Sequence, residues 1–501
     1  MDPKFQELKD RLTEIGDLKA ALAILSWDQM TFMPLGGGEA RGRQIATLER
    51  LAHEKFITPE MGRLLDELQP LLDEVGPGSA TAALIKVTTR DYHQAVKIPP
   101  TFAAEFSEHT SKTYEAWARA KHERNFKIVE PLLEKTLEFS RQMANFYPGY
   151  QHIADPLIDQ LDEGMTVATI RPLFQKLRVE LAHLVKAITS QPGPDDSCLR
   201  QLYPEAGQVK FGLEVAEKLG FDFKRGRQDE SPHPFTTSFG IDDVRITTRI
   251  KPNFLPEALF STIHETGHAL YEQGINPDFD GTPLADGASM SIHESQSRLW
   301  ENLVGRSCSF WEYFYPRLQE VFPEQLKGVS LDTFYRAINM VERSLIRTDA
   351  DEVTYNLHVM IRFDLETELL EGKLAVRDLP EAWNERYRSD LGILPPDDSV
   401  GVLQDMHWYS GTIGGYFQSY TMGNILSAQI YEAALQAVPK IPVEIASGNF
   451  GSLHSWLKEN IYRYGRQYPA AEIIKSATGR DLEIEPYIRY LKTKYGELYK
   501  L

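Results

Sequence analysis

Two histidines and a glutamate near the middle of the chain have the types and the spacing of a metal-dependent hydrolase. Residues 263–270 place His264 and His268 four positions apart, with Glu265 directly after the first histidine. On a helix this spacing puts both imidazoles on one face, so both can bind one divalent ion. Glu265 is poorly placed for a third ligand, but it can reach a water on the ion as the general base. The pattern predicts hydrolysis of an amide by a water whose pKa the metal lowers.

Glu294 is the candidate third ligand, and it lies in a polar segment expected to begin a second helix that ends near Arg306. A catalytic zinc takes three protein ligands and keeps one open position, which two histidines and one glutamate satisfy. His293, on the same turn, is the rival ligand. A ligand histidine usually gives its second N–H to a carboxylate. Arg298 stands four residues after Glu294, where an acid would be useful, so this carboxylate must come from elsewhere.

The metal motif lies in a segment that Pro256 opens and Gly274 closes, the order of breakers that is typical of a helix. Apolar residues at helical spacing predict helices along most of the chain. The segments are residues 5–25, 41–56, 59–72, 100–146, 167–189 and 204–219.

One region just before the metal motif alternates by twos instead. Residues 235–240 and 243–250 have Val244, Ile246 and Thr248 on one face and Arg245 on the other. This pattern predicts a short hairpin or small sheet. The expected fold class is therefore all-α, mostly helical, with a small β-sheet beside the active site.

The composition and the charge of the chain favour some classes of protein and argue against others. The 501 residues are 42% hydrophobic and 25% charged, which is typical of a globular protein with a large core. The net charge of -18 argues against nucleic acid and against an anionic membrane surface as partners. We expect no signal peptide and no membrane span, since no stretch approaches about 18 apolar residues. Two cysteines, Cys198 and Cys308, predict no disulfide framework and fit a cytoplasmic location.

Several short motifs are spread over the whole chain. They are Trp27-Asp28-Gln29 with Met33-Pro34, His233-Pro234-Phe235, Asp243-x-Arg245-x-Thr247, His264-Glu265-x-x-His268, His293-Glu294-Ser295-Gln296, Ile346-Arg347-x-x-Ala350-Asp351 and Gly401-x-x-Gln404-Asp405-x-His407-Trp408. Each motif alone is weak, whereas the set in this order is specific. With this set the sequence resembles the carboxypeptidase Taq family of metallocarboxypeptidases.

The resemblance implies a helical architecture similar to neurolysin and angiotensin-converting enzyme. It implies one catalytic domain over residues 1–501, with two helical lobes around a deep central cleft. The expected activity is release of single C-terminal residues from peptides, with broad side-chain tolerance that excludes proline. The resemblance also implies a homodimer and one zinc ion per chain, for which cobalt can substitute. By this match His264, His268 and Glu294 are the ligands and Glu265 is the catalyst.

A carboxypeptidase must also recognise a free carboxylate, and a guanidinium suits this task because it binds bidentately. Arg347 is the first choice, since it lies in a segment expected to be helical and rich in polar residues. The alternative for Arg347 is a buried ion pair with Asp349 or Asp351. Arg245 and His233 are the second choices for substrate binding.

Two interpretations remain open for the alternating segment before the metal motif. Either the Arg245 side chain binds substrate, or the backbone of the segment binds an extended peptide through hydrogen bonds. In that case Arg245 is structural and pairs with Asp243 across the turn.

The tetrahedral oxyanion needs a side-chain donor besides the metal. In the wider group of helical peptidases a His and a Tyr past the third ligand have this role, which makes His407 and Tyr420 the catalytic candidates here. Tyr416 is a candidate for substrate binding, and the alternative for both tyrosines is ordinary helix packing. The glycines of residues 410–415 predict a mobile loop that can close on substrate.

Two other functions remain as alternatives. The first is an oligopeptidase that cuts internal bonds of short peptides, because a helical architecture of this type supports both activities. The second is a non-catalytic helical protein that binds a metal for structure. A structural zinc site has four protein ligands and is closed, and no fourth ligand is evident in the sequence.

Overall fold

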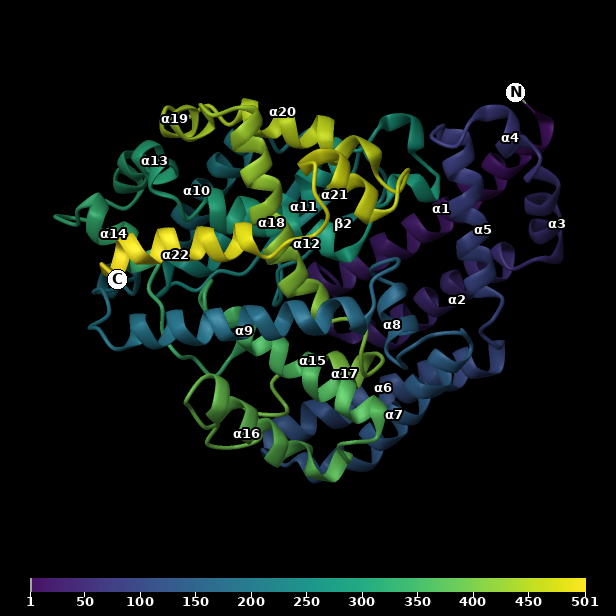
Figure 1. The fold of residues 1–501 in the computed structure, drawn as a ribbon, viewed down its shortest axis with the longest axis horizontal. Coiled ribbons are helices and arrows are strands. Elements are labelled where there is room, and N and C mark those ends of the chain that lie inside the picture. The colour runs from purple at the N-terminus through teal and green to yellow at the C-terminus, as the bar shows by residue number, and fades with distance from the viewer. Residues whose placement is uncertain (1) are drawn as a thin grey trace. The chain divides into compact units, whose positions relative to one another are not determined.

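The computed structural model describes residues 2–501, and within that range the protein is mostly helical with one small sheet (Figure 1). This confirms the expected fold class. The chain divides into two compact units. The first consists of the described residues up to Ala95 with Asp195–Ile338 and Leu426–Glu483. The second consists of Val96–Pro194, Asn339–Ile425 and Ile484–Leu501.

The first unit contains the helix that carries the metal motif. Its helices are α1 (Pro3–Thr31), α2 (Gly38–Phe56), α3 (Pro59–Leu68), α4 (Leu71–Val75), α5 (Ala80–Ala95), α10 (Glu205–Leu219), α11 (Leu255–Gly274), α12 (Met290–Arg298), α13 (Cys308–Val321), α14 (Leu331–Ile338), α19 (Ile441–Ala446), α20 (Gly451–Asn460) and α21 (Ala470–Thr478). A π-helical turn, Leu299–Val304, continues directly from α12. The helix α18 (Gln418–Ala437) begins in the second unit and continues into the first.

The sheet also belongs to the first unit. Its strands are β1 (Gly226–Glu230), β2 (Thr236–Ser238) and β3 (Val244–Thr248), in the order β1-β3-β2. β2 and β3 form the predicted antiparallel hairpin, with Thr236 opposite Ile246. β1 runs parallel to β3 and was not predicted, because its sequence is polar and lacks β-branched residues.

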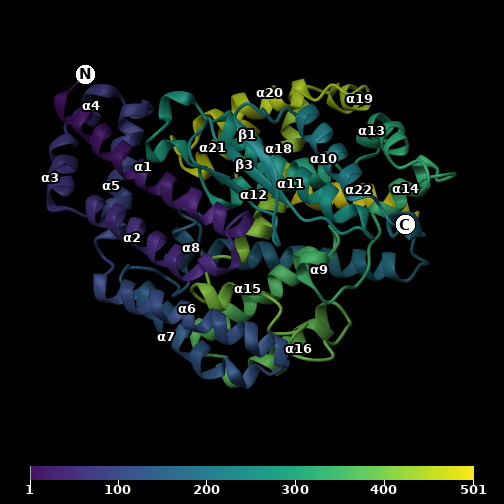
Figure 2. The ribbon, with the colours of Figure 1, turned by 180° about the vertical axis from the view of Figure 1, so that it is seen from behind.

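The central position of β3 in the sheet decides whether its backbone can bind an extended peptide. Its backbone pairs with β1 on one side and with β2 on the other. A strand that is paired on both sides offers no edge to an extended peptide. The suggestion that this strand binds substrate through its backbone is therefore wrong for β3. Its apolar residues Val244 and Ile246 are buried, and β3 packs against α11 (Figure 2).

The second unit is helical. Its helices are α6 (Pro100–Glu123), α7 (Glu130–Asn145), α8 (Asp155–Asp159), α9 (Val167–Thr189), α15 (Tyr355–Glu371), α16 (Leu379–Asp390), α17 (His407–Ser410) and α22 (Glu485–Tyr499). The predicted helical stretch of residues 100–146 is broken, because α6 ends at Arg124 in the left-handed conformation with φ 54°. The predicted stretch of residues 59–72 is likewise broken, between α3 and α4.

The segment around Arg347 departs from the expectation. Arg347–Asp349 forms a single 3-10 turn, and Ala350 is extended. The helix α15 begins only at Tyr355. Arg347 therefore lies in a turn before the helix, and the prediction that it lies within a helix is wrong.

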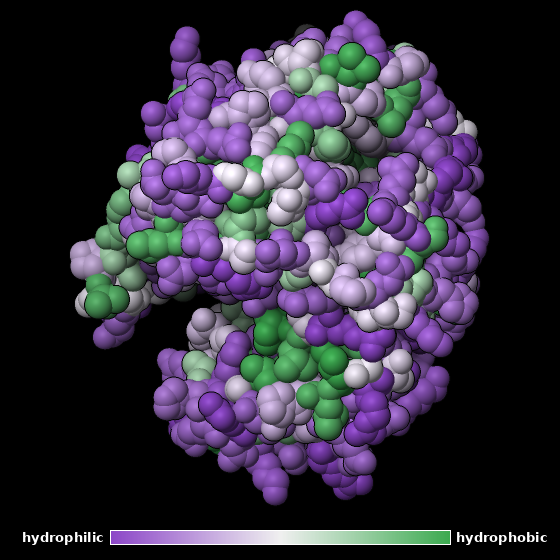
Figure 3. Space-filling model, turned by 90° about the vertical axis from the view of Figure 1, so that its left-hand side faces the viewer, coloured by the Kyte–Doolittle hydropathy of each residue, from purple (hydrophilic) through white to green (hydrophobic). Residues whose placement is uncertain are grey.

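Polar residues cover most of the face shown in Figure 3, as the share of charged residues suggests. Among residues 2–501, none of the helices has both the length and the apolar character that crossing a bilayer requires.

Candidate metal centre

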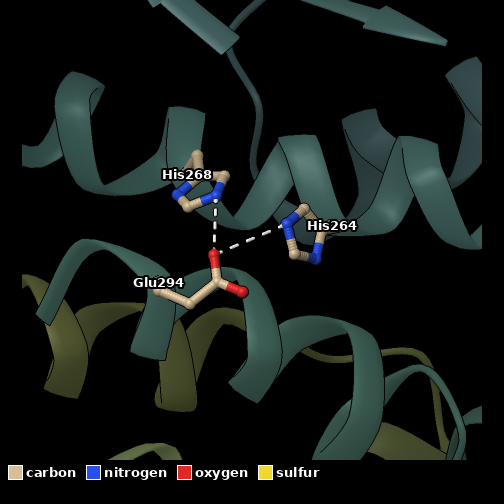
Figure 4. A group of neighbouring side chains, drawn as sticks. All are labelled: His264, His268 and Glu294. Carbon is tan, nitrogen blue, oxygen red and sulfur yellow. Dashed lines mark ion pairs between the residues drawn. The ribbon is translucent and has the colours of Figure 1, made fainter. Parts of the chain in front are cut away.

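The structure brings the three predicted ligands together in the first unit. One ligand atom from each of His264, His268 and Glu294 lies within 4.8 Å of the others. Glu294 Oε2 is 3.7 Å from His264 Nε2 and 3.4 Å from His268 Nε2. Figure 4 shows both imidazoles on α11 directed toward the carboxylate on α12. Two imidazoles and one carboxylate form a donor set that fits a catalytic divalent ion.

Gly267 allows the two helices to approach closely enough for this arrangement. A Cβ atom at this position would lie 2.6 Å from Ser297 Cα and 2.7 Å from the carbonyl oxygen of Gln296. Both contacts are with the backbone of α12, so a side chain here would require the helices to move apart. The glycine between Glu265 and His268 thus has a packing role that the motif alone did not indicate.

Glu301 is a functional candidate that the sequence did not identify. Its Oε2 lies 2.9 Å from His264 Nδ1, so it is the carboxylate that holds the second nitrogen of this ligand. The π-helical turn after α12 carries it, and its register there is not visible in the sequence. Arg298 binds both acids, with Nε at 2.7 Å from Glu294 Oε1 and Nη1 at 3.3 Å from Glu301 Oε2.

His293 does not belong to the group of converging ligand atoms, which come from His264, His268 and Glu294. Its Nδ1 lies 2.6 Å from His268 Nδ1, which is the nitrogen of His268 remote from Glu294. Its Nε2 lies 2.6 Å from Glu272 Oε1. The geometry therefore gives no support to His293 as the rival ligand, and it places this residue behind His268.

Glu265 lies beside the ligands and is held by the sheet. It is 6% exposed, and its Oε2 accepts a hydrogen bond of 2.7 Å from Thr236 Oγ1 on β2. Burial raises the pKa of this carboxyl above its ordinary value, although His264 opposes the shift. A raised pKa suits a group that takes up a proton and then returns it.

The charges around the site favour an anionic Glu294 and a neutral His268. Burial opposes ionisation of Glu294, but Arg298 and His264 outweigh it and hold its pKa well below the ordinary value. Burial also opposes ionisation of Glu301, yet its contacts with His264 and Arg298 lower its pKa to about 2. Burial lowers the pKa of His268 to about 3, so its imidazole is neutral near pH 7. Anionic Glu294 and neutral His268 are therefore in the forms that bind a metal, whereas burial of His264 is outweighed by Glu294 and Glu301, which raise its pKa.

The other predicted residues of the first unit are placed differently. Arg245 forms a bidentate ion pair with Asp243, with both contacts at 2.8 Å, as the structural alternative for this arginine predicted. Its guanidinium also lies over the rings of Trp27 and Phe239, at 4.5 and 4.7 Å from their centroids. His233 is exposed on the loop between β1 and β2. These contacts favour a structural role for Arg245 in the sheet.

Arg347 belongs to a buried charge cluster in the second unit. Its Nε and Nη2 lie 3.0 and 2.9 Å from Asp405 Oδ1, and its Nη1 lies 3.1 Å from the hydroxyl of Tyr355. Arg362 binds the other oxygen of Asp405 at 2.5 Å. An ion pair was the alternative prediction for Arg347, but the partner is Asp405 and neither of the two aspartates first considered. Two guanidinium groups around one carboxylate leave a net positive charge.

His407, Tyr416 and Tyr420 also lie together in the second unit. His407 Nε2 is 3.2 Å from the hydroxyl of Tyr420, and its ring centroid is 5.1 Å from that of Tyr416. The ring of Tyr420 covers the Arg347 guanidinium at 5.2 Å.

The backbone at Gly415 has φ 93°, and a Cβ there would lie 2.5 Å from the carbonyl oxygen of Leu157. Glycine is therefore required at this position.

Comparison with known proteins identifies the family of the chain. Residues 7–495 match the family of carboxypeptidase Taq (M32) metallopeptidases. Carboxypeptidase 1 of Bacillus subtilis is 37% identical over 497 residues, which cover 99% of each chain. Thermostable carboxypeptidase 1 of Thermus thermophilus is 38% identical over 507 residues, again 99% of each.

Solved structures are similar over the whole chain. The M32 carboxypeptidase of Deinococcus radiodurans is 47% identical and superposes with a TM-score of 0.98, covering 100% of both chains. The carboxypeptidase of Pyrococcus furiosus is 36% identical, with a TM-score of 0.95 over 99% of each chain. The chain therefore belongs to the carboxypeptidase Taq (M32) family of metallopeptidases and is a metallocarboxypeptidase.

Proposed function

We propose that this metallocarboxypeptidase holds one divalent ion with His264, His268 and Glu294 and uses Glu265 as its general base and acid. The convergence of the three ligand atoms within 4.8 Å, with a buried carboxylate beside them, is the observation that carries the proposal. We further propose zinc as the ion, with cobalt as a substitute, because a donor set of two His and one Glu is typical of catalytic zinc.

The side chains around the ligands prepare them for binding. Glu301 accepts a hydrogen bond from the Nδ1–H of His264, which leaves the lone pair of Nε2 on the side that faces Glu294. Arg298 engages Glu294 Oε1 and leaves Oε2 facing the two imidazoles. His264 and Glu294 thus each have one atom bound by a neighbouring side chain and one atom directed into the site.

Glu265 carries the proton through the reaction. A divalent ion held by these ligands would supply Lewis acidity, which lowers the pKa of a water molecule and polarises a carbonyl group. Glu265 accepts a proton as the water oxygen bonds to the carbonyl carbon, and it returns a proton to the nitrogen as the C–N bond breaks. Thr236 restrains this carboxylate through its hydrogen bond to Oε2. The products are a shortened peptide and one free amino acid.

For the substrate carboxylate we propose Arg347. A guanidinium has five N–H groups, and the contacts with Asp405 and Tyr355 use three of them. The net positive charge of Arg347, Arg362 and Asp405 favours an anion. We propose His407 and Tyr420 as donors to the oxyanion and Tyr416 as a residue that contacts substrate. Arg245 and His233 remain weaker candidates, since Arg245 is paired with Asp243.

The finer biological assignments are also proposals. We propose a single catalytic domain over residues 1–501, broad side-chain tolerance that excludes proline, and a homodimer in the cytoplasm. Both cysteines, Cys198 and Cys308, are free thiols, which suits a reducing compartment. Light scattering of the purified protein tests the dimer, and a monomer at micromolar concentration would contradict it.

A matched pair of peptides tests the proposed activity. One peptide has a free C-terminal carboxylate and the other has the same sequence with a C-terminal amide. We expect rapid loss of the last residue from the free acid only, abolition by a chelator, and recovery with zinc or cobalt. Equal cleavage of the two peptides would contradict carboxylate recognition. Full activity in metal-free protein would contradict the metal mechanism.

A further inference from the structure

The two ligand histidines are supported from behind in different ways. Nδ1 of His264 faces a carboxylate directly, at 2.9 Å from Glu301 Oε2. Nδ1 of His268 faces a second histidine, at 2.6 Å from His293 Nδ1. The carboxylate behind His268 is therefore reached through His293: Glu272 Oε1 lies 2.6 Å from His293 Nε2.

Metal binding by His268 determines the direction of the hydrogen bonds that join His268, His293 and Glu272. Nε2 of His268 faces Glu294, so a neutral His268 that binds through Nε2 carries its proton on Nδ1. That N–H must donate to His293 Nδ1, because the two nitrogens are only 2.6 Å apart. His293 Nδ1 is then an acceptor and its own proton lies on Nε2, from which it donates to Glu272. One choice of proton position thus satisfies all three groups.

The surroundings hold the His293 ring in this orientation. The ring of Tyr271 lies 5.3 Å away on a neighbouring turn of α11, and its hydroxyl accepts a hydrogen bond of 3.0 Å from the Ala288 N–H. The backbone next to Ala288 therefore approaches His293 closely. A Cβ at Gly287 would lie 2.7 Å from His293 Cδ2, so any residue larger than glycine at this position would displace the ring.

We propose that His293 and Glu272 form a relay that orients His268 and keeps its proton on Nδ1, which strengthens metal binding. Both are positioning residues that act through His268. The inference rests on the proposed function, since it takes His268 as a ligand through Nε2. It also explains how a histidine next to Glu294 in sequence contributes to the site without being a ligand.

The relay is tested by the zinc affinity of the full chain, measured by competition with a chromophoric chelator. We expect His293→Phe to weaken zinc binding by about 10- to 100-fold, as is common when a partner behind a ligand is lost. His293→Asn retains an acceptor at the place of Nδ1, so it should lose less affinity than the Phe variant. Glu272→Gln removes the negative charge and should also weaken binding.

Glu257→Gln is the matched control. Glu257 lies on the same helix as Glu272, and the two side chains are similarly exposed, at 15% and 14%. It pairs with Arg249 and Lys251, remote from the ligands along α11, so its replacement should leave zinc affinity unchanged. The melting temperature of each metal-free variant separates loss of orientation from loss of folding.

The outcomes distinguish the relay from the function on which it rests. Unchanged zinc affinity in both His293→Phe and Glu272→Gln, with normal binding by the wild type, would overturn the relay and leave the proposed function intact. Equal losses in the Asn and Phe variants, accompanied by equal losses of metal-free stability, would assign His293 a purely structural role. If the Phe variant fails to fold, the Asn and Gln variants decide. A wild type that binds no zinc would contradict the proposed function itself.

Discussion

Arg298 donates a hydrogen bond of 2.7 Å from Nε to Oε1 of Glu294, one helical turn before it on α12. The pair is almost fully enclosed, since the Glu294 side chain is 5% exposed. The contact does two things for the site. It holds the carboxylate ionised despite burial, and it leaves Oε2 to face the two imidazoles.

Arg298→Met should therefore weaken both folding and metal binding. Removing one partner of a buried ion pair leaves the other charge uncompensated, which costs roughly 3–5 kcal/mol of the free energy of unfolding. Urea unfolding of the metal-free protein measures this loss. Zinc affinity should also fall by about tenfold or more, because Glu294 loses its orientation. Arg298→Lys retains the charge and should lose less, and an unchanged zinc affinity in Arg298→Met would show that Glu294 needs no such support.

Glu265→Gln should separate catalysis from metal binding. The amide has the same size, can still accept from Thr236, and cannot take up a proton. We expect kcat for a free-acid peptide to fall by about 100- to 10,000-fold, the usual contribution of a general base. Metal content, measured by elemental analysis, should stay at one ion per chain. Turnover near the wild-type rate with metal bound would require another base.

Gly267→Ala tests the close approach of α11 and α12. The new methyl group would meet backbone atoms of Ser297 and Gln296 at 2.6 and 2.7 Å, which flexible side chains cannot relieve. Overpacking of this kind costs about 1–3 kcal/mol of the free energy of unfolding, and the separated helices should also bind zinc less tightly. Urea unfolding and chelator competition measure the two effects.

Gly496→Ala is the control for this substitution. Gly496 also lies in a helix, α22, but a Cβ there would meet no atom within 4 Å. Alanine should stabilise the protein by about 0.5–1 kcal/mol, because glycine is the poorer helix former. If both substitutions have the same effect, the contact between α11 and α12 does not depend on Gly267.

The sequence predicted those parts of the site that depend on local periodicity. A spacing of four residues on a helix places His264 and His268 on one face whatever the surroundings are. Alternation of residue types likewise predicted the β2–β3 hairpin. Glu294 followed from its type and its distance from the motif. These features follow from residue types and their spacing along the chain.

What could not be predicted depends on contacts between elements. Glu301 reaches His264 from the π-helical turn that follows α12. Asp405 replaces the nearby acids as the partner of Arg347, 58 positions away in the chain. The polar strand β1 is stabilised by its pairing with β3, which composition does not reveal. Contacts between distant segments thus determine the structure of these residues more than their local propensity does.

Glu366 on α15 gives the protein a pH-dependent stability apart from the metal ligands. Its side chain is buried and accepts a hydrogen bond of 2.6 Å from Trp408 Nε1. Burial raises its pKa from 4.5 to about 7, against the opposing effects of this hydrogen bond, the Gly414 N–H and Arg362. The buried carboxyl is therefore protonated at pH values where the unfolded chain is already ionised.

The sign of the effect follows from proton uptake. Between pH 4.5 and about 7 the folded protein binds this proton and the unfolded chain does not, so stability is greatest below this window and falls as the pH rises through it. The loss from this one group is on the order of 3 kcal/mol and is complete above the folded pKa. Glu366→Gln keeps an acceptor for Trp408 and cannot ionise. It should therefore be more stable than the wild type above the window and should show a flatter profile within it.

Urea unfolding at a series of pH values measures the difference between the two proteins, which removes the contributions of all other titrating groups. Glu368→Gln is the control, because it removes a carboxylate from the same helix where the side chain is 31% exposed and pairs with Arg386. That variant should keep the wild-type profile across the window. Parallel profiles for the wild type and Glu366→Gln would mean that the carboxyl ionises in the folded protein as readily as in the unfolded chain. Burial beside Trp408 would then impose no cost on its charge.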